Sequence, residues 1–142
     1  MRFVDTNVLL YAISSAPPDD AKAQRAGELL AAGDLALSVQ VLQEFYVQAT
    51  RTSAASPISP DDAVALITTF AVFPVQDLTP ALVQSAITTH RRRRISYRDA
   101  AIVEAARALG CDTILTEDLQ HGQVFEKSLT VRNPFSAKPA AE

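Results

Sequence analysis

Four carboxylic acids, far apart in the sequence, have the side chains and positions that a hydrolytic metal site needs. Asp5 ends the first apolar run and is the only acid in the first eighteen residues, and Asp118 follows a late apolar run. Glu44 and Asp99 lie near the starts of helical segments. Oxygen ligands without His or Cys beside them favour hard divalent ions such as Mg²⁺ or Mn²⁺. Such ions activate water and stabilise an in-line displacement at phosphorus, often as a pair about 4 Å apart.

The segments that carry these acids alternate between short β-type runs and longer helical ones. The β-type runs are residues 2–6, 35–38, 72–76, 113–116 and 129–132. The helical segments are residues 7–15, about 19–32, 39–51, 61–71, 79–93 and 96–109. This alternation predicts an α/β fold of right-handed βαβ units, built as a three-layer α/β/α sandwich around a mainly parallel sheet.

Such a fold would bring the four acids to one edge of the sheet. Asp5 and Asp118 follow strands, so both are expected at the carboxyl edge, where ligands bind in open α/β sheets. Crossover helices run antiparallel to the strands, so their first turns, with Glu44 and Asp99, reach the same edge. Asp99 also shares the apolar face of its helix, where a carboxylate needs a cation or a hydrogen-bond donor.

Each acid alone also has a structural interpretation. Asp5 can cap the helix that follows it, and Ser96 with Asp99 resembles a capping box. Glu44 lies at the border of a buried helix face and fits a solvated position, while Asp118 fits a turn. The shared edge favours a common site, because independent caps and turns would not require it.

Length and composition indicate one compact domain. The chain has 142 residues, 48% of them apolar, and a net charge of −3. This charge excludes a protein that coats nucleic acid non-specifically, but it allows a local basic patch. Cys111 is the only cysteine, which excludes an intramolecular disulfide and a multi-cysteine zinc site. No apolar run could span a bilayer, so we expect a cytoplasmic domain over residues 1–132 and a disordered tail over 133–142.

Five of the ten arginines precede the third acid closely: Arg91, Arg92, Arg93, Arg94 and Arg98. Cations at the end of the helix over 79–93 suit its dipole and keep it soluble. Alternatively, these side chains supply phosphate contacts beside an acidic pocket that would otherwise repel RNA. The sequence leaves both interpretations open.

Four segments together resemble the PIN-domain nucleases. They are Val4–Tyr11 (VDTNVLLY), Val39–Tyr46 (VQVLQEFY), Asp99–Ala106 (DAAIVEAA) and Ile114–Leu119 (ILTEDL). The first resembles the opening of the family's domain, the next two its second and third acidic segments, and the last the strand and acid that complete the site. Their order and spacing match over nearly the whole chain. Its size is similar to that of the VapC-type toxins of bacterial toxin–antitoxin pairs.

The resemblance implies an endoribonuclease that depends on Mg²⁺ or Mn²⁺ and whose acids are Asp5, Glu44, Asp99 and Asp118. Its polar neighbours would be Thr6, Asn7 and Thr116, and Glu117 could share the role of the fourth acid. The implied partners are the RNA substrate, an inhibitory antitoxin protein and a second copy of the chain. The family usually carries an aromatic residue before its third acid, whereas this chain has Arg98.

The mechanism that we expect is metal-assisted hydrolysis of an RNA phosphodiester. Asp5 and Asp99 would hold a Mg²⁺ that binds the scissile phosphate and a water, which Glu44 and Asp118 would orient, directly or through a second metal. An aspartyl phosphatase would need an acid at position 7, which is Asn7. A response-regulator-like receiver would need paired early acids, which the chain lacks. The alternative that stays open is a catalytically silent module that binds RNA or a protein partner.

Overall fold

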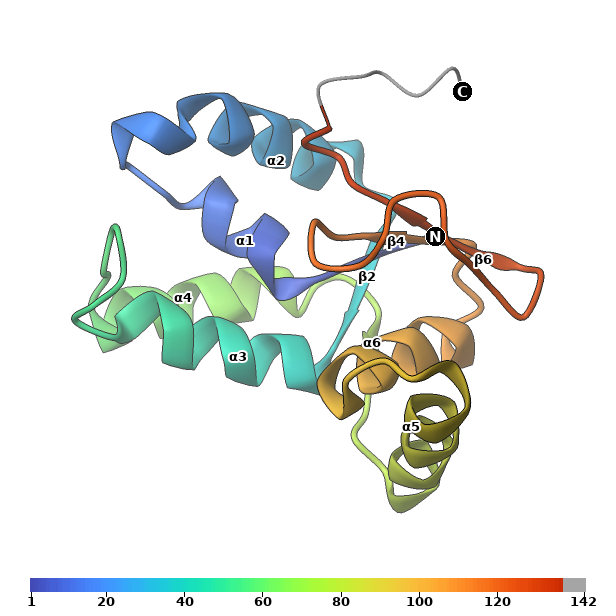
Figure 1. Cartoon of the computed structure of the whole chain (residues 1–142). Coiled ribbons are helices and arrows are strands. Elements are labelled where there is room, and N and C mark those ends of the chain that lie inside the picture. Colours follow the sequence, from blue (N-terminus) through green and yellow to red (C-terminus); the bar gives the residue numbers. More distant parts are fainter. Residues whose placement is uncertain (137–142) are drawn as a thin grey trace.

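A six-stranded sheet forms the centre of the molecule in a computed structural model that describes residues 1–136 (Figure 1). The strands are β1 (Arg2–Val4), β2 (Leu35–Ser38), β3 (Val75–Gln76), β4 (Thr113–Leu115), β5 (Val124–Phe125) and β6 (Leu129–Arg132). Their order is β3-β2-β1-β4-β6-β5, and all neighbours are parallel except β5 and β6. The predicted α/β class with a mainly parallel sheet is confirmed.

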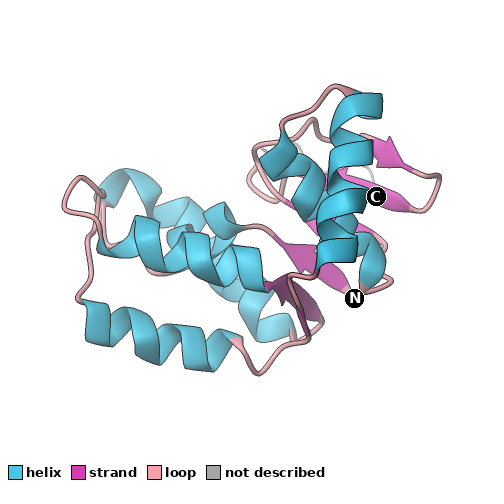
Figure 2. Cartoon of the chain, turned by 90° about the horizontal axis from the view of Figure 1, so that it is seen from below, coloured by secondary structure: helices cyan, strands magenta, loops and turns pink. Residues whose placement is uncertain are grey.

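Helices cover both faces of the sheet. They are α1 (Thr6–Ala12), α2 (Asp20–Ala32), α3 (Val39–Thr50), α4 (Pro60–Phe70), α5 (Pro80–Arg93) and α6 (Tyr97–Ala108), with a 3-10 turn, η1, at Pro17–Asp19. α1 and α2 lie on one side and α5 and α6 on the other, while α3 extends beside α1 and α4 packs against α3 (Figures 1 and 2). This is the predicted α/β/α sandwich. Within residues 1–136, no helix has the length and apolar character needed to cross a membrane.

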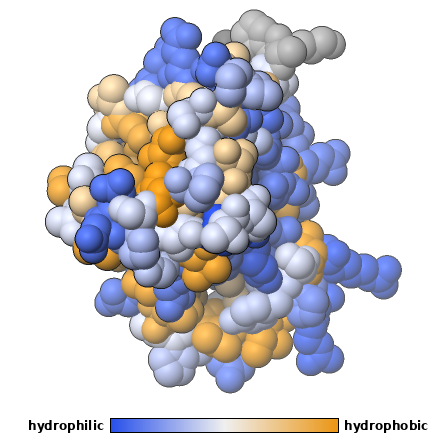
Figure 3. Space-filling view, turned by 90° about the vertical axis from the view of Figure 1, so that its left-hand side faces the viewer, coloured by the Kyte–Doolittle hydropathy of each residue, from blue (hydrophilic) through white to orange (hydrophobic). Residues whose placement is uncertain are grey.

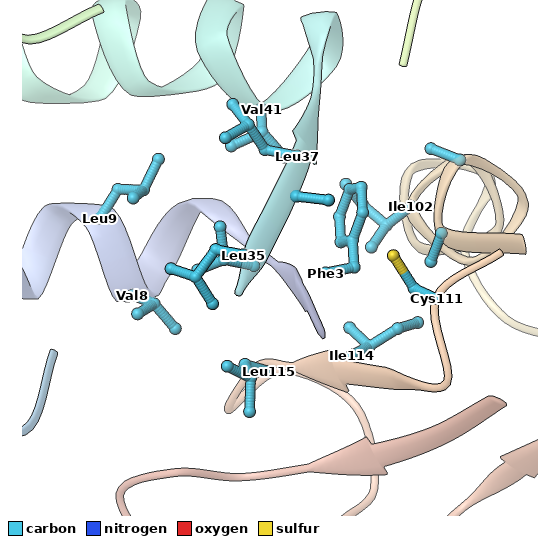
Figure 4. Packing of buried hydrophobic residues seen from close by; sticks show 14 of the residues in the cluster. Phe3, Val8, Leu9, Leu35, Leu37, Val41, Ile102, Cys111, Ile114 and Leu115 are labelled. Carbon is cyan, nitrogen blue, oxygen red and sulfur yellow. The ribbon is translucent and has the colours of Figure 1, made fainter. Parts of the chain in front are cut away.

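The core explains why strand residues are buried in succession. All four positions of β2 are buried, because helices cover the sheet on both sides. Phe3 of β1 lies with Ile102 on the α6 side, whereas Leu35 of β2 lies toward Val8 and Leu9 of α1 (Figure 4). Packing on both faces therefore fixes the strands, and this fixes the positions of the residues that follow them at the carboxyl edge.

Side-chain caps fix the starts of the helices that reach this edge. Ser38 accepts a hydrogen bond from a backbone amide in the first turn of α3, and Ser96 accepts one from the amide of Asp99 at 3.0 Å. Asp5 accepts one from the amide of Thr6 at 2.7 Å and so caps α1. Asp5 therefore does have the structural role considered for it, and this role uses only part of its acceptor capacity.

The observed elements differ from the predicted ones in four main places. The helix predicted over 7–15 ends at Ala12, as α1, because the chain turns at the next residue. β1 ends at Val4, two residues early, because the next residue begins the cap of α1. The strand predicted over 72–76 shrinks to β3, because a turn follows α4. β5, which has only two residues, was not predicted. The turn from β5 to β6 places Glu126 and Lys127 in left-handed backbone without the glycine that usually marks such hairpins.

The end of the described chain packs against α1 and α2. The ring of Phe135 meets that of Tyr11 edge-on, with centroids 4.9 Å apart, and Nζ of Lys22 lies 5.6 Å from the Phe135 ring centre. Contacts with the domain thus continue beyond residue 132, where we predicted its boundary. The remainder of the tail predicted to be disordered, residues 137–142, lies outside the described residues.

We predict that Phe135→Ala lowers the free energy of unfolding by about 1–2 kcal/mol, because it removes an aromatic contact and partly buried apolar area. Urea denaturation of the full chain measures this loss. The control is Val72→Ala, which truncates an apolar side chain that is 84% exposed. Equal stability of the two variants would show that residue 135 contributes no packing.

Candidate active site

β1 and β4 are neighbours in the sheet, so the residues that follow them meet at its carboxyl edge. Val4 pairs with Leu115, and the amide of Asp5 donates to the carbonyl of Leu115 at 3.0 Å. The hydroxyl of Thr116 donates to Oδ2 of Asp5 at 2.8 Å. Both Asp5 and Thr116 are buried. The carboxylate of Asp5 is thus held inside the protein by the strand pairing itself.

α3 and α6 bring the second and third acids to the same edge. Gln40 of α3 links the two helices, because its amide donates to the carbonyl of Arg98 and to Oε2 of Glu44, both at 3.3 Å. The hydroxyl of Thr6, at the start of α1, donates to Oε1 of Glu44 at 2.7 Å. Asp99 lies in the first turn of α6, directly after Arg98. Three helices therefore begin around one point.

The guanidinium of Arg98 occupies the centre of the acids and binds two of them through paired hydrogen bonds. Nη2 and Nη1 donate to Oδ1 and Oδ2 of Asp5 at 2.6 and 3.1 Å. Nη2 and Nε donate to Oε1 and Oε2 of Glu44 at 2.6 and 3.0 Å. Nη1 also lies 3.2 Å from Oδ1 of Asp99 and 4.0 Å from Oδ2 of Asp118. The four acids predicted from the sequence are brought together, around an arginine of the same chain.

Charge pairing at this centre shifts two pKa values. Burial would lower the pKa of Arg98, but its hydrogen bonds to Asp5 and Glu44 hold that pKa above its ordinary value. Burial would likewise raise the pKa of Glu44, yet the hydrogen bonds from Arg98 and Thr6 hold it below its ordinary value of 4.5. At neutral pH a charged guanidinium therefore faces an ionised Glu44, joined by charge-assisted hydrogen bonds.

Asp118 lies at the outer side of the cluster, where its side chain is 52% exposed. Nδ2 of Asn7 donates to Oδ2 of Asp118 at 3.0 Å and to the hydroxyl of Thr116 at 3.1 Å. Burial raises the pKa of Asp118, and the hydrogen bond from Asn7 opposes this rise. Oδ1 of Asn7 is buried without a hydrogen-bond partner among the described residues. An unsatisfied acceptor thus lies next to the acids.

Glu117 takes part in a different set of hydrogen bonds. It accepts from the hydroxyl of Tyr11 at 2.5 Å and from Nζ of Lys22 at 2.9 Å. Burial and the hydrogen bond to Glu117 raise the pKa of Tyr11, so the phenol keeps its proton and goes on donating at neutral pH. The carboxylate of Glu117 joins the end of β4 to α1 and α2, whereas Asp118 is the acid near Arg98.

The arginine cluster divides into side chains with structural contacts and side chains at the surface. Arg92 forms an ion pair with Glu126 at 2.9 Å. Arg93 donates to the carbonyl of residue 124 at 3.0 Å and lies over the ring of Phe125. Both therefore attach the end of α5 to the hairpin of β5 and β6. Arg91 and Arg94 are exposed.

Two features of the site were not predicted from the sequence. Arg98 was assigned to the RNA-contacting cluster, whereas the structure places its guanidinium among the acids. Gln40, which positions both Glu44 and α6, was not singled out. Signals for both residues exist in the sequence: Gln40 lies one helical turn before Glu44, and Arg98 is the cation directly beside Asp99.

The oxygen atoms of the four acids are of the type that binds a hard divalent cation, but the guanidinium of Arg98 lies where these acids converge. Within residues 1–136, no three Asp, Glu, His or Cys side chains are grouped so that they could hold a metal ion. The donor chemistry is nevertheless that of a Mg²⁺ site, with carboxylate oxygens and the unsatisfied Oδ1 of Asn7 beside them. The residues therefore fit such an ion in their donor chemistry, whereas the guanidinium of Arg98 lies where the acids converge.

We predict that Glu44→Gln makes stability less sensitive to acid. Because the pKa of Glu44 is lowered by folding, its contribution is present above pH 4.5 and is lost as the pH falls through the folded-state pKa. The variant should be less stable than wild type at neutral pH, and the gap should narrow toward pH 3 as Glu44 of wild type protonates. Urea titrations at several pH values measure this, with Glu28→Gln, at an exposed position of α2, as the control. A gap that stays constant with pH would contradict the ion pair.

Solved structures provide a comparison for this fold and site. A toxin–antitoxin complex from Klebsiella pneumoniae matches with a TM-score of 0.70 and 15% identity, over 95% of this chain and 98% of that one. VapC20 of Mycobacterium tuberculosis, a toxin that cleaves the sarcin–ricin loop, matches with a TM-score of 0.61 and 24% identity, over 83% of this chain and 90% of that one. VapBC2 of Rickettsia felis, bound to a DNA fragment from its promoter, matches with a TM-score of 0.61 and 19% identity, over 93% and 98%.

At these identities the solved structures establish a shared fold. No curated protein matches the chain. The family model of the PIN domain matches residues 2–126, which is most of the sequence and includes all four acidic segments. The resemblance found in the sequence is confirmed, and the chain belongs to the PIN-domain family.

Proposed function

We propose that this PIN domain is a Mg²⁺-dependent endoribonuclease and the toxin of a type II toxin–antitoxin pair. The observation that carries the proposal is the convergence of the acids Asp5, Glu44, Asp99 and Asp118, from four distant segments, at the carboxyl edge of the sheet. Caps and turns alone do not require this convergence. Membership of the PIN family supports a common role for these acids.

In the proposed site, Asp5 and Asp99 hold the metal ion, for which Mn²⁺ can replace Mg²⁺. The ion supplies a Lewis acid that lowers the pKa of a water and neutralises charge on the phosphate. Glu44 and Asp118 orient the water, and Asp118, as the most exposed of the four, faces the solvent from which water arrives.

Three polar neighbours keep these carboxylates in place. Thr116 holds Asp5, Thr6 holds Glu44 and Asn7 holds Asp118, each through one hydrogen bond of 2.7–3.0 Å. Short side chains on strand ends and first helical turns have little freedom to move. Their part in the mechanism is to keep the acids oriented when charge redistributes during hydrolysis.

The proposal that the substrate is RNA rests on two features. They are the resemblance of the acidic segments to those of ribonucleases of the family and the basic end of α5. Arg91 and Arg94 are exposed there and would contact phosphates, which an acidic pocket alone repels. One similar protein is described as a toxin that cleaves the sarcin–ricin loop, which favours nucleic-acid cleavage by this chain too.

The proposed protein partners are an antitoxin and a second copy of the chain. Similar structures include a toxin–antitoxin complex and VapBC2. α3 and α4 line an open groove with Leu42, Tyr46, Val47 and Ile67, and Val47 is 63% exposed. Orange patches are visible on the face shown in Figure 3, which views the molecule from the left of Figure 1. Exposed apolar surface of this kind favours a protein partner.

We predict that Asp99→Asn reduces cleavage by at least about a hundredfold, as expected when a group that holds a metal is removed. The assay is cleavage of a mixed structured and single-stranded RNA pool in Mg²⁺, in Mn²⁺ and in EDTA. Asp5→Asn should behave alike, but Asp99 is the sharper test because Asp5 also caps α1. The matched control is Asp61→Asn, at an exposed acid in the first turn of α4.

Cleavage that persists in EDTA or in Asp99→Asn would refute the metal-dependent nuclease. If the pure, folded chain neither cuts RNA nor binds a divalent ion, the silent binding module is favoured. The position of Arg98 among the acids is the observation that keeps this second candidate open.

Charge reversal at the two exposed arginines tests RNA binding. We predict that Arg91→Glu with Arg94→Glu weakens RNA binding and lowers the slope of log affinity against log salt by about 1 for each phosphate that the protein no longer neutralises. Binding is measured by fluorescence anisotropy at several salt concentrations in the Asp99→Asn background. Arg25→Glu with Arg51→Glu changes net charge equally at sites on α2 and after α3. An equal effect of both pairs would indicate that only net charge matters.

A further inference from the structure

Arg98 contacts the two acids that we propose to hold the metal ion: it donates to both oxygens of Asp5 and lies 3.2 Å from Oδ1 of Asp99. An ionised carboxylate offers about four acceptor positions on its two oxygens. Oδ1 of Asp5 accepts from the amide of Thr6 and from Arg98, and Oδ2 accepts from Thr116 and from Arg98. The four positions of Asp5 are therefore filled, two of them by one guanidinium.

Glu44 is saturated in the same way. Its Oε1 accepts from the hydroxyl of Thr6 and from Arg98, and its Oε2 accepts from Gln40 and from Arg98. With the guanidinium present, neither carboxylate has an acceptor position left for a divalent cation. If it moves away, each carboxylate regains two positions and keeps two donors that hold it in place.

The backbone at Arg98 is held without the help of its guanidinium. The side chain is 32% exposed, so solvent already reaches it. The first turn of α6 is held by hydrogen bonds that do not involve the guanidinium: the cap from Ser96 and the hydrogen bond from Gln40 to the carbonyl of residue 98. Rotation about side-chain bonds is therefore sufficient to move the charge out of the cluster.

We propose that Arg98 is an internal counter-cation that excludes the divalent metal from Asp5, so that metal binds only when its guanidinium leaves Asp5 and Glu44. This inference rests on the proposed metal-dependent function. Four carboxylates in one place repel one another unless a cation joins them. Arg98 supplies that cation and thereby weakens metal binding in proportion to the fraction of molecules in which it occupies the site.

The test is Mn²⁺ binding to the full chain by calorimetry. Arg98→Gln removes the positive charge and the paired hydrogen bonds of the guanidinium. This variant should bind Mn²⁺ at least about tenfold more tightly than wild type. Without added metal the same variant should have a lower Tm, which Mn²⁺ should raise by more than it raises that of wild type. The control Arg51→Gln, an equal loss of charge at an exposed position after α3, should bind Mn²⁺ as wild type does.

A second measurement does not depend on the folding of a variant. In wild type, the Nε–H NMR signal of Arg98 should shift as Mg²⁺ is added, because its hydrogen bond to Glu44 breaks. The proposal would be overturned if wild type and Arg98→Gln bound Mn²⁺ with equal affinity, or if the Arg98 signal stayed unchanged at saturating Mg²⁺. If metal-dependent cleavage persists in that case, the proposed function stands and only the role of Arg98 fails. If neither protein binds Mn²⁺ and neither cuts RNA, both fail.

Discussion

Repulsion among four carboxylates at one sheet edge is the constraint on which the whole site depends. Asp5 is fully buried and Glu44 is largely so, and charged groups that lie side by side in such a site are costly unless a cation joins them. Arg98 meets this need with a bidentate interaction with each. A metal that binds Asp5 or Glu44 must replace that interaction, so the affinity of the site for metal and its stability without metal are linked.

The fold produces this crowding through ordinary rules of α/β architecture. β1 and β4 are parallel neighbours, which places Asp5 beside Thr116. The helices that follow β2 and precede β4 begin at the same edge, and serine caps set their first turns. Covering the sheet on both faces fixes the strands, so short polar side chains at their ends become precise supports for the acids.

These rules show why part of the site could be predicted from the sequence. Asp5 and Asp99 were predictable because strand ends and helix starts have local signals. The position of the Arg98 side chain was not, since it depends on how α6 packs against α1 and α3. β5 was missed because two residues carry no periodicity and its turn lacks glycine. The packing of Phe135 depends on Tyr11, which is distant in the sequence.

A crystal structure of the full chain grown with Mn²⁺, with data collected at the manganese absorption edge, tests the central claim most directly. We predict an anomalous peak about 2.0–2.2 Å from carboxylate oxygens of Asp5 and Asp99, with the guanidinium of Arg98 turned away from Asp5. A structure at saturating Mn²⁺ with Arg98 still paired to Asp5 and Glu44 and no anomalous peak among the acids would contradict it.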